Sequence, residues 1–258
     1  MTITFISDLH ISETQPEIAN QFIDFLENHA QDCDALYILG DLFEYWIGDD
    51  NPNPYYKNII LYLNKYTNNG TPTYFMHGNR DFLIGEKFSK DTGIKILQDP
   101  SIIKINEERV LISHGDIFCT DDHEYHATRK LTRDPKWQTM MLGKSIAERE
   151  KFALEARIKS KKYTKYLPEN ITDINQNEII KTFINNNITK ILHGHTHRPA
   201  IHNIVINKVT HQRIVLGDWY EQGSILEWGK SGPNLITLNL SLIHISEPTR
   251  RTPISYAV

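Results

Sequence analysis

The stretch "YFMHGNR" (residues 74–80) contains the pattern that decides the fold. An apolar run from Tyr74 to Met76 is followed almost at once by a glycine, an asparagine and an arginine. Short apolar runs without alternation are typical of strands that are buried on both faces. A strand that stops in such residues indicates that Asn79 and Arg80 are held out at its end for a chemical purpose.

Four other apolar runs end in the same way. They cover 3–6, 35–39, 110–112 and 191–192, and the polar groups after them are Ser7-Asp8-Leu9-His10, Gly40-Asp41, Ser113-His114-Gly115-Asp116 and His193-Gly194-His195-Thr196-His197. Ligands of open α/β sheets bind at the carboxyl ends of the strands, so we expect these groups to lie close together. Asp8 and His10 are two residues apart and should point the same way on an extended chain.

Helical patterns separate the first three apolar runs. In 16–30, Pro16 suits the first helical position and apolar residues recur at helical spacing, and a second pattern over 55–66 stops before Asn69-Gly70. This alternation of strand and helix predicts an α/β sheet. Three later runs, bounded by Gly and Pro, are predicted to be antiparallel strands: 213–216, 224–226 and 234–238.

The segment from about 120 to 185 differs from the rest in pattern and charge. Residues 129–165 hold twelve Lys and Arg against four Asp and Glu, a net +8 within a chain of net charge −4. We interpret the segment as a helical insertion, or cap, in a single domain that spans 1–240. The simplest account of its charge is a solvated helix pair with i,i+4 pairs such as Glu155–Lys159.

The composition and the two ends of the chain limit the class of protein. No apolar run approaches the roughly 18–20 residues of a membrane span, and the N-terminus has no signal-peptide pattern. Cys33 and Cys119 form no disulfide framework, so we expect a reducing compartment. A net charge of −4 gives no bulk argument for nucleic acid as a partner.

The last residues are set aside from the fold. The string "LSLIHISEPTR" (240–250) resembles the translation of a transposon adapter used in sequencing libraries, and "ISYAV" (254–258) fits the continuation of that adapter. We predict that 240–258 is an artefactual read-through tail. The alternative is a genuine disordered tail, and resequencing with another library chemistry distinguishes the two.

The polar groups at the strand ends supply the donor atoms of a metal site. Together they offer two carboxylates, four imidazoles and one amide oxygen: Asp8, Asp41, His10, His114, His195, His197 and Asn79. These are too many for a four-coordinate structural zinc site, and mixed nitrogen and oxygen ligands suit Mn, Fe, Mg or Zn. If Asp41 bridges, the seven ligands divide between two ions about 3.5–4 Å apart, an arrangement suited to phosphoryl transfer.

The ordered motifs Asp8-Leu9-His10, Gly40-Asp41, Gly78-Asn79, His114-Gly115 and Gly194-His195-Thr196-His197 resemble those of the calcineurin-like metallophosphoesterases over residues 1–200. The resemblance implies a four-layer α/β sandwich with a dinuclear metal site. One ion would be held by Asp8, His10, Asp41 and His197, and the other by Asp41, Asn79, His114 and His195. A hydroxide that bridges the ions would be the nucleophile.

Arg80 is a departure from that superfamily, where a histidine usually follows the motif asparagine. Arginine keeps its charge and presents a planar fork of donors to phosphate oxygens. It is a poor general acid, so its expected role is to stabilise charge on the phosphoryl group, which suits a leaving group such as a phosphate. The structural alternative for Arg80 is a surface ion pair with Asp81.

Longer strings resemble the family of UDP-2,3-diacylglucosamine pyrophosphohydrolases of lipid A biosynthesis over about 1–240. They are "GDLFEYWIGDD" (40–50), "HGNRDFLIGEKF" (77–88), "SHGDIFCTDDHEYHATR" (113–129), "HGHTHRPAIH" (193–202) and "LGDWYEQGS" (216–224). The resemblance implies hydrolysis with two Mn²⁺ ions per chain, Mg²⁺ or another divalent ion being the alternative. Water would attack the α-phosphorus, and the products would be 2,3-diacylglucosamine 1-phosphate (lipid X) and UMP.

The same resemblance assigns roles to individual residues. Arg80, Asp41 and His195 would be catalytic, and the substrate would contact Asn79, Arg80, Asp122, Ser160, Thr164 and His195. Two positions depart from the family: residue 164 is commonly asparagine, and the family's lysine three residues later is Leu167 here. Lys162 and Lys165 are the candidates to replace that lysine.

An anionic lipid substrate gives the basic insertion a second interpretation. Cationic amphipathic helices bind anionic membrane surfaces. Apolar residues of the insertion could line an acyl pocket, contact lipid or simply pack the cap onto the domain: Trp137, Met140, Met141, Leu142, Ile146, Phe152 and Leu154. We expect a cytoplasmic protein that attaches peripherally to the cytoplasmic face of the inner membrane, with no nucleic acid and no obligate protein partner.

Two other functions remain open from the sequence. One is a metallophosphoesterase with a soluble substrate, such as a nucleotide phosphodiesterase, a dinucleotide polyphosphatase or a protein phosphatase. The arginine at position 80 in place of the usual histidine, and the apolar, basic insertion, argue against a soluble substrate. The other is a non-catalytic scaffold that has lost its metal, but all seven ligand types are present.

Overall fold

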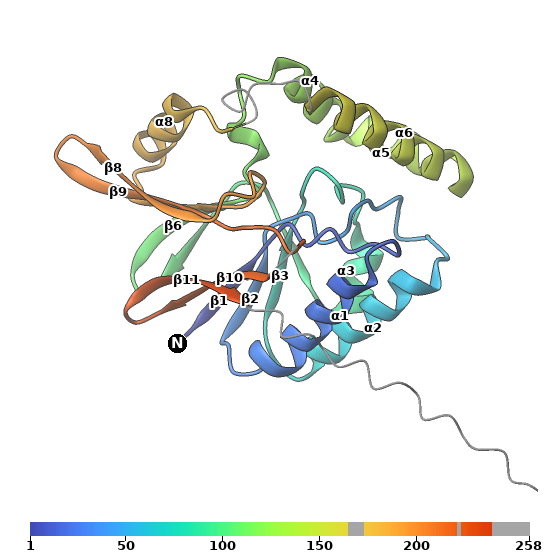
Figure 1. Ribbon diagram of the computed structural model, residues 1–258, viewed down its shortest axis with the longest axis horizontal. Helices are drawn as coiled ribbons and strands as arrows, with labels where there is room; N and C mark the ends of the chain where they lie inside the picture. Colours follow the sequence, from blue (N-terminus) through green and yellow to red (C-terminus); the bar gives the residue numbers. More distant parts are fainter. Residues whose placement is uncertain (165–172, 221–222, 239–258) are drawn as a thin grey trace, which may run out of the picture.

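Two β-sheets lie face to face between outer helices in the computed structural model, which describes residues 1–164, 173–220 and 223–238 (Figure 1). The first sheet has the strand order β11-β10-β1-β2-β3-β4. Its strands are β1 (Ile3–Ile6), β2 (Ala35–Ile38), β3 (Thr73–Met76), β4 (Lys95–Leu97), β10 (Gly223–Gly229) and β11 (Gly232–Leu238). Strands β1 to β4 pair in parallel, and β10 joins β1 antiparallel.

The second sheet has the order β5-β6-β7-β9-β8. Its strands are β5 (Ser101–Ile105), β6 (Glu108–Ser113), β7 (Lys190–His193), β8 (Ala200–Ile206) and β9 (Val209–Val215). The prediction for the run 213–216 is only half right, because β9 is antiparallel to β8 but parallel to β7. The hairpin β8–β9 places β9 in the interior of the sheet, where its second neighbour runs in the same direction.

Three apolar cores separate four layers. The first lies between the first sheet and the helices α1 (Pro16–Asp24), α2 (Pro54–Asn68) and α3 (Glu86–Thr92). The second fills the space between the sheets, where Phe5 of β1 meets Trp228 of β10 and the sequence-distant Ile214 contributes to the same cluster. The four-layer sandwich that the motifs imply is therefore confirmed, and both predicted helices form, the first ending in a π-helix over Phe25–His29.

The helices of the insertion divide into two groups. Helix α8 (Gln176–Asn186) packs Ile179 and Phe183 against Leu111 and Ile191, which makes it the outer layer of the second sheet. The other three extend across the ends of the strands (Figure 1) and are called the cap below: α4 (His123–Thr132), α5 (Pro135–Leu142) and α6 (Ile146–Thr164).

One expected ion pair of the cap is wrong. Lys159 Nζ lies 2.8 Å from Glu124 Oε1 on α4, while Glu155 lies 3.9 Å from Lys151 on its own helix. Lys159 thus joins two cap helices rather than two turns of one. Within the described residues, no helix has the length and apolarity needed to cross a membrane. The predicted tail, 240–258, and the positions Lys165 and Leu167 lie outside the described residues.

Candidate metal and active site

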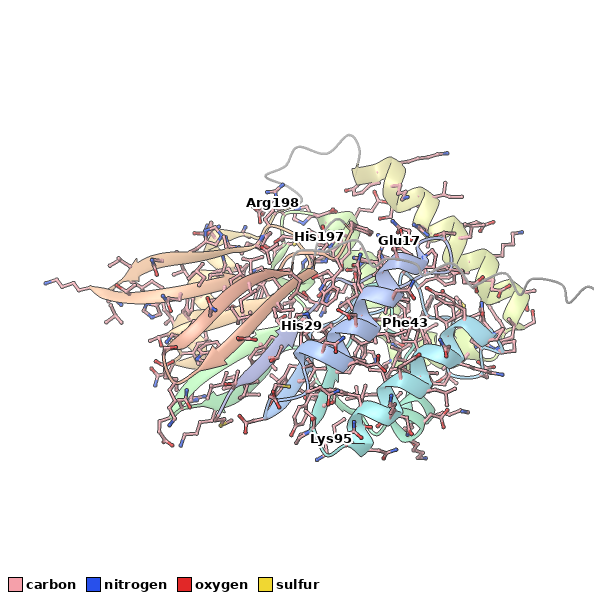
Figure 2. The ribbon with its side chains drawn as sticks, turned by 60° about the horizontal axis from the view of Figure 1, so that its bottom comes forward. Glu17, His29, Phe43, Lys95, His197 and Arg198 are labelled. Atoms are coloured by element: carbon pink, nitrogen blue, oxygen red, sulfur yellow. The ribbon has the colours of Figure 1, made fainter. Side chains whose placement is uncertain are left out.

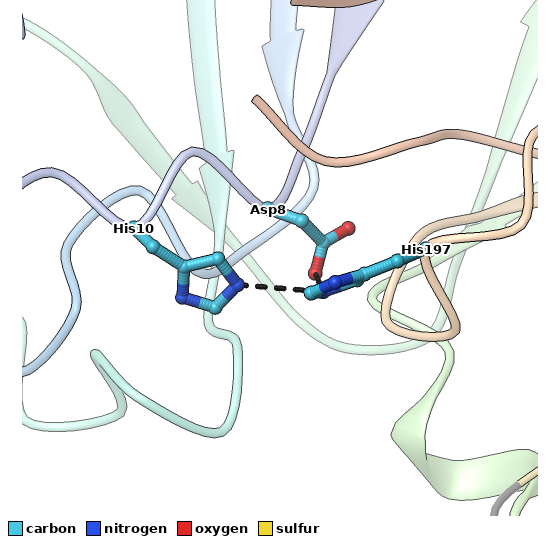
Figure 3. A group of neighbouring side chains, drawn as sticks. All are labelled: Asp8, His10 and His197. Atoms are coloured by element: carbon cyan, nitrogen blue, oxygen red, sulfur yellow. Dashed lines mark hydrogen bonds and ion pairs between the residues drawn. The ribbon is translucent and has the colours of Figure 1, made fainter. Parts of the chain in front are cut away.

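Three of the predicted ligands meet where β1 and β7 end. His197 Nε2 lies 3.3 Å from Asp8 Oδ1 and 3.4 Å from His10 Nε2 (Figure 3). His10 Nε2 is in turn 3.9 Å from Asp41 Oδ2. Donor atoms that bind one ion at about 2.1 Å lie about 3–3.4 Å from each other, so the spacing of the first three donors suits a shared cation.

The other predicted ligands meet on the far side of Asp41. His114 Nε2 lies 3.8 Å from Asp41 Oδ2 and 2.9 Å from Asn79 Oδ1. His195 Nδ1 lies 2.9 Å from the same Asn79 oxygen and 3.2 Å from His114 Nε2. The seven side chains thus form two groups, with Asp41 Oδ2 between them. We call these seven residues the strand-end centre.

The backbone of the strand-end centre is unusual. Positive φ angles occur at Asp8 (56°), His10 (56°), Asp41 (52°), His195 (68°) and His197 (55°). A left-handed backbone costs a residue other than glycine about 1–2 kcal/mol, and such conformations concentrate at functional sites. Asp8 and His10 do lie close together, as predicted, but strand alternation is not the reason. The strand ends at Ile6, and left-handed turns bring the two side chains together.

A glycine precedes Asn79 because two loops approach each other closely at Gly78. A Cβ atom on Gly78 would overlap the carboxylate and the backbone nitrogen of Asp41, so the loops after β2 and β3 approach this closely only with glycine here. The Gly78 N–H donates to Asp81 Oδ1 at 2.8 Å, and the Leu42 N–H donates to Asp81 Oδ2 at 2.8 Å. Asp81 is fully buried and ties the two loops together, which contradicts the alternative of a surface pair with Arg80.

Outer partners orient the imidazoles. His114 Nδ1 donates to the Leu39 carbonyl oxygen at 2.9 Å, which leaves Nε2 facing the centre. His197 Nδ1 lies 3.0 Å from Asp218 Oδ2. Figure 2 shows His197 with its neighbour Arg198 on the loop after β7, far from Lys95. Metal-binding histidines usually make such contacts through their second nitrogen. The sequence analysis missed Asp218 as a partner, although the string "LGDWYEQGS" contains it.

The electrostatics of the centre favour a cation. Burial alone would lower the pKa of His114, but the carboxylates of Asp41 and Asp8 raise it to about 9. For His197, hydrogen bonds with Asp218 and Asp8 overcome the effect of burial and raise the pKa to about 10. Asp8 Oδ1 is buried, and apart from His197 Nε2 at 3.3 Å it has no hydrogen-bond partner among the described residues. The metal-free centre therefore attracts positive charge, and divalent ions fit its donor set.

A cavity of about 490 Å³ separates the strand-end loops from the cap. Asn79 and Arg80 form part of its wall on the loop side, with Phe82 and Trp46 beside them. The rest of the wall comes mainly from α4, α5 and α6, including the apolar side chains Trp137, Met141 and Phe152. The cavity thus joins one of the predicted ligands to an apolar chamber.

The predicted substrate contacts lie in different places. Asp122 and Ser160 line the cavity, as do Asn79 and Arg80. Asp122 Oδ1 also accepts hydrogen bonds from the Tyr125 N–H at 2.8 Å and the Tyr163 hydroxyl at 3.0 Å. His195 belongs to the centre, and its ring packs 5.7 Å from that of Tyr125. Thr164 ends α6, and its side chain lies outside the described residues.

A buried acidic cluster that the sequence analysis missed fixes α4 beside the centre. Arg129 Nε donates to Asp116 Oδ2 and Arg129 Nη2 to Asp99 Oδ2, each at 2.9 Å. Tyr125 donates its hydroxyl hydrogen to Asp116 Oδ2 at 2.7 Å. Asp99 Oδ1 accepts from the backbone N–H of His114 at 3.2 Å. The cap is therefore anchored one contact away from a predicted ligand.

Comparisons with known proteins find relatives of this chain. The family model for calcineurin-like phosphoesterases matches residues 1–199. A protein of Stenotrophomonas maltophilia (strain R551-3) named UDP-2,3-diacylglucosamine hydrolase is 46% identical over 246 residues, covering 93% of this chain and 99% of that protein. One of the same name from Xanthomonas oryzae pv. oryzae (strain PXO99A) is 44% identical over 242 residues, covering 91% and 98%.

Among solved structures, an archaeal phosphodiesterase matches with 13% identity and a TM-score of 0.46, covering 92% of this chain and all of that one.

Proposed function

The chain belongs to the calcineurin-like phosphoesterase family, and from this we propose that it hydrolyses the pyrophosphate bond of UDP-2,3-diacylglucosamine in lipid A biosynthesis. The oxygen of water joins the α-phosphorus, and the bond from that phosphorus to the bridging oxygen breaks. The products are UMP and 2,3-diacylglucosamine 1-phosphate. The names and the coverage of the two relatives support this substrate.

The observation that carries the proposal is the cavity that joins a phosphate-binding wall to an apolar chamber. At one end, Asn79 belongs to the strand-end centre and Arg80 stands beside it. At the other, Trp137 and Phe152 pack 5.6 Å apart, centroid to centroid, on neighbouring cap helices. A substrate with a pyrophosphate and two acyl chains needs both kinds of surface, whereas a soluble nucleotide needs only the first.

The strand-end centre would hold two Mn²⁺ ions, divided as the motifs imply, with Asp41 shared. Such ions supply Lewis acidity at phosphoryl oxygens and lower the pKa of the attacking water. The protein's own contribution is to hold the donors rigidly. Asp8 Oδ2 accepts from the Ser7 hydroxyl at 2.5 Å and from the His195 N–H at 2.9 Å, which leaves Oδ1 directed at His197.

In this proposal Arg80 stabilises the phosphoryl group. Its backbone N–H donates to Asp41 Oδ1 at 2.8 Å, and its half-buried side chain lines the cavity. Arg80 Nε is buried and has no hydrogen-bond partner among the described residues. A guanidinium that is not already neutralised can bind phosphate oxygens as their charge grows in the transition state.

The cap supplies the contacts that select the lipid. Asp122, Ser160 and Thr164 are proposed to face the glucosamine, and the acyl chains to occupy the chamber near Trp137 and Phe152. In this proposal the cap and the sandwich form one domain up to about residue 240, with 240–258 an artefact.

Exposed apolar side chains on the cap support peripheral attachment to the cytoplasmic face of the inner membrane. Met140, Leu142 and Leu154 are 55%, 42% and 59% exposed, and they lie among the basic residues of 129–165. Burial of such side chains in the interface adds to attraction of lysines by anionic lipids. Flotation of the protein with anionic liposomes at low salt tests this part, and failure to float there contradicts it.

The deciding experiment is an assay of the purified full-length chain on UDP-2,3-diacylglucosamine with added Mn²⁺. We expect lipid X and UMP in equal amounts, and loss of turnover with a chelator. Bis-p-nitrophenyl phosphate is the matched soluble substrate. If it is hydrolysed well and the lipid nucleotide is not, the chain is a phosphodiesterase with another substrate.

A further inference from the structure

A buried carboxylate connects the cap to a predicted ligand. Glu44, on the loop after β2, is only 3% exposed. Its Oε1 atom lies 2.9 Å from Nε of Arg157 on α6, and its Oε2 atom lies 3.4 Å from Nδ1 of His10. His10 Nε2 faces the opposite way, toward His197 and Asp41. One chain of contacts therefore runs from the cap helix to the strand-end centre.

Each buried group in this series of contacts depends on the next for a charge or hydrogen-bond partner. A carboxylate taken out of water is costly unless a cation or hydrogen-bond donors face it, and Arg157 is the cation that faces Glu44. Glu44 Oε2 and His10 Nδ1 are both buried and otherwise lack hydrogen-bond partners among the described residues. An imidazole that binds an ion through Nε2 carries its proton on Nδ1, and Glu44 Oε2 is positioned to accept it.

We propose that Glu44 is a positioning residue that fixes the His10 ring for the ion held by Asp8, His10, Asp41 and His197, and that Arg157 couples this site to the seating of α6. The inference rests on the metal centre of the proposed function. Its consequence is that the cap acts on metal affinity as well as on the lipid. If α6 moves away from the loop after β2, Glu44 loses the cation that faces it and His10 loses a fixed hydrogen-bond acceptor.

The same helix offers a matched control. Arg149 also anchors α6 to the loop after β2, donating from Nη1 to Asp50 Oδ1 at 2.7 Å and from Nη2 to Asp50 Oδ2 at 2.5 Å. Its Nη1 atom donates to the Ile47 carbonyl oxygen at 2.6 Å as well. None of these groups touches a predicted ligand in the described structure. Arg149→Met therefore removes one anchor of α6 while Arg157 still holds the helix on Glu44, so the Arg157–Glu44–His10 contacts persist.

The test is a Mn²⁺ titration of the full-length chain, stripped of metal and free of substrate, followed by calorimetry and by Mn²⁺ paramagnetic resonance. Glu44→Gln keeps the shape and removes the charge, and we expect one of the two sites to weaken by about 10–100-fold. Arg157→Met should weaken the same site by about tenfold, and Arg149→Met should leave both sites unchanged. The absorption spectrum of the Co²⁺-loaded protein should change in the first two variants only.

Three results overturn the inference. The first is a Glu44→Gln protein that binds Mn²⁺ like the wild type. The second is an Arg149→Met protein that loses as much affinity as Arg157→Met, which would mean that cap contacts in general set the affinity. If Glu44→Gln does not fold, the double variant Glu44→Gln/Arg157→Met, which leaves no buried charge unpaired, decides by the same titration, and wild-type affinity in it overturns the inference. A wild type that binds no Mn²⁺ defeats the proposed function and this inference together, whereas the first two results leave the function intact.

Discussion

The strand-end centre and the cap face each other across one cavity, and they differ in burial, backbone and type of contact. Asp8 and His114 are fully buried, and Asp41 is 2% exposed. On the cap, Leu131 and Leu154 are 54% and 59% exposed. The centre is held by short loops in left-handed conformations, and the cap by long side chains that reach down to those loops.

This difference teaches where chemistry and selection are located. Loops that leave the strand ends of two packed sheets are suited to hold donors to within about 0.5 Å, which a catalytic site requires. Helices held at a few contact points can shift to admit a large ligand more easily than loops fixed at the ends of sheet strands can. The predictions below test this division, from the largest expected effect to the smallest.

Asp41→Ala breaks the centre itself. It removes the oxygen that lies between the two groups of donors, so both should lose their geometry and turnover should fall by more than about 100-fold. Metal content, measured by elemental analysis after purification without chelator, should fall in parallel. A variant that keeps both its metal and its activity would show that Asp41 is not shared.

Arg80→Ala tests the border between the two regions. The guanidinium lines the cavity without holding a donor of the centre, so kcat should fall by about 100–1,000-fold while metal content stays the same. Arg80→Lys keeps the charge and loses the planar fork, and it should recover part of the rate. A kcat near the wild-type value for Arg80→Ala would contradict the argument that an arginine at this position suits a phosphate leaving group.

The pH dependence of metal binding sharpens the electrostatic side of the comparison. Because the pKa values of His114 and His197 are raised to about 9 and 10, both imidazoles are protonated near pH 7 in the metal-free protein. Binding must expel those protons, so affinity should rise with pH up to that range, by about tenfold per pH unit for each proton released. Competition with a Mn²⁺ indicator dye between pH 6 and 9 measures this slope, and a flat profile would contradict it.

Phe152→Ala tests the apolar chamber of the cap. The side chain lines the cavity and packs on Trp137, so its loss should raise KM for the lipid substrate by up to about tenfold with little change in kcat. Leu154→Ala is the control, since this neighbour on the same helix is 59% exposed and does not line the cavity. Equal effects of the two variants in a detergent assay would argue against an acyl site there.

Leu154→Ser should have the smallest effect on turnover and a measurable effect on membranes. In detergent its kcat and KM should match the wild type, while its fraction bound to anionic liposomes should fall by about threefold to tenfold. Val205→Ser, which removes a 70% exposed apolar side chain from β8 rather than from the cap, is a matched control that should bind liposomes like the wild type.

Much of the fold follows from local patterns. The five apolar runs that end in polar groups are strands, and both predicted helices form where Pro16 and Gly70 mark a start and an end. Strands β4, β5 and β8 escaped notice because their sequences, KIL, SIIKI and AIHNIVI, do not alternate polar and apolar residues along the whole strand. The role of α8 was hidden because a helical pattern does not reveal which sheet it covers.

By itself, the sequence determined which donors stand at the strand ends, because each follows directly on its own apolar run. Only the tertiary structure decided how they meet. Asp8 and His197 are far apart in the chain, and they come within 3.3 Å because two sheets pack together and left-handed turns aim the side chains inward. The tertiary structure also gave Glu44, Asp81 and Asp218 their partners. A side chain's chemistry is local, whereas its neighbours are set by contacts between distant segments, which no local pattern encodes.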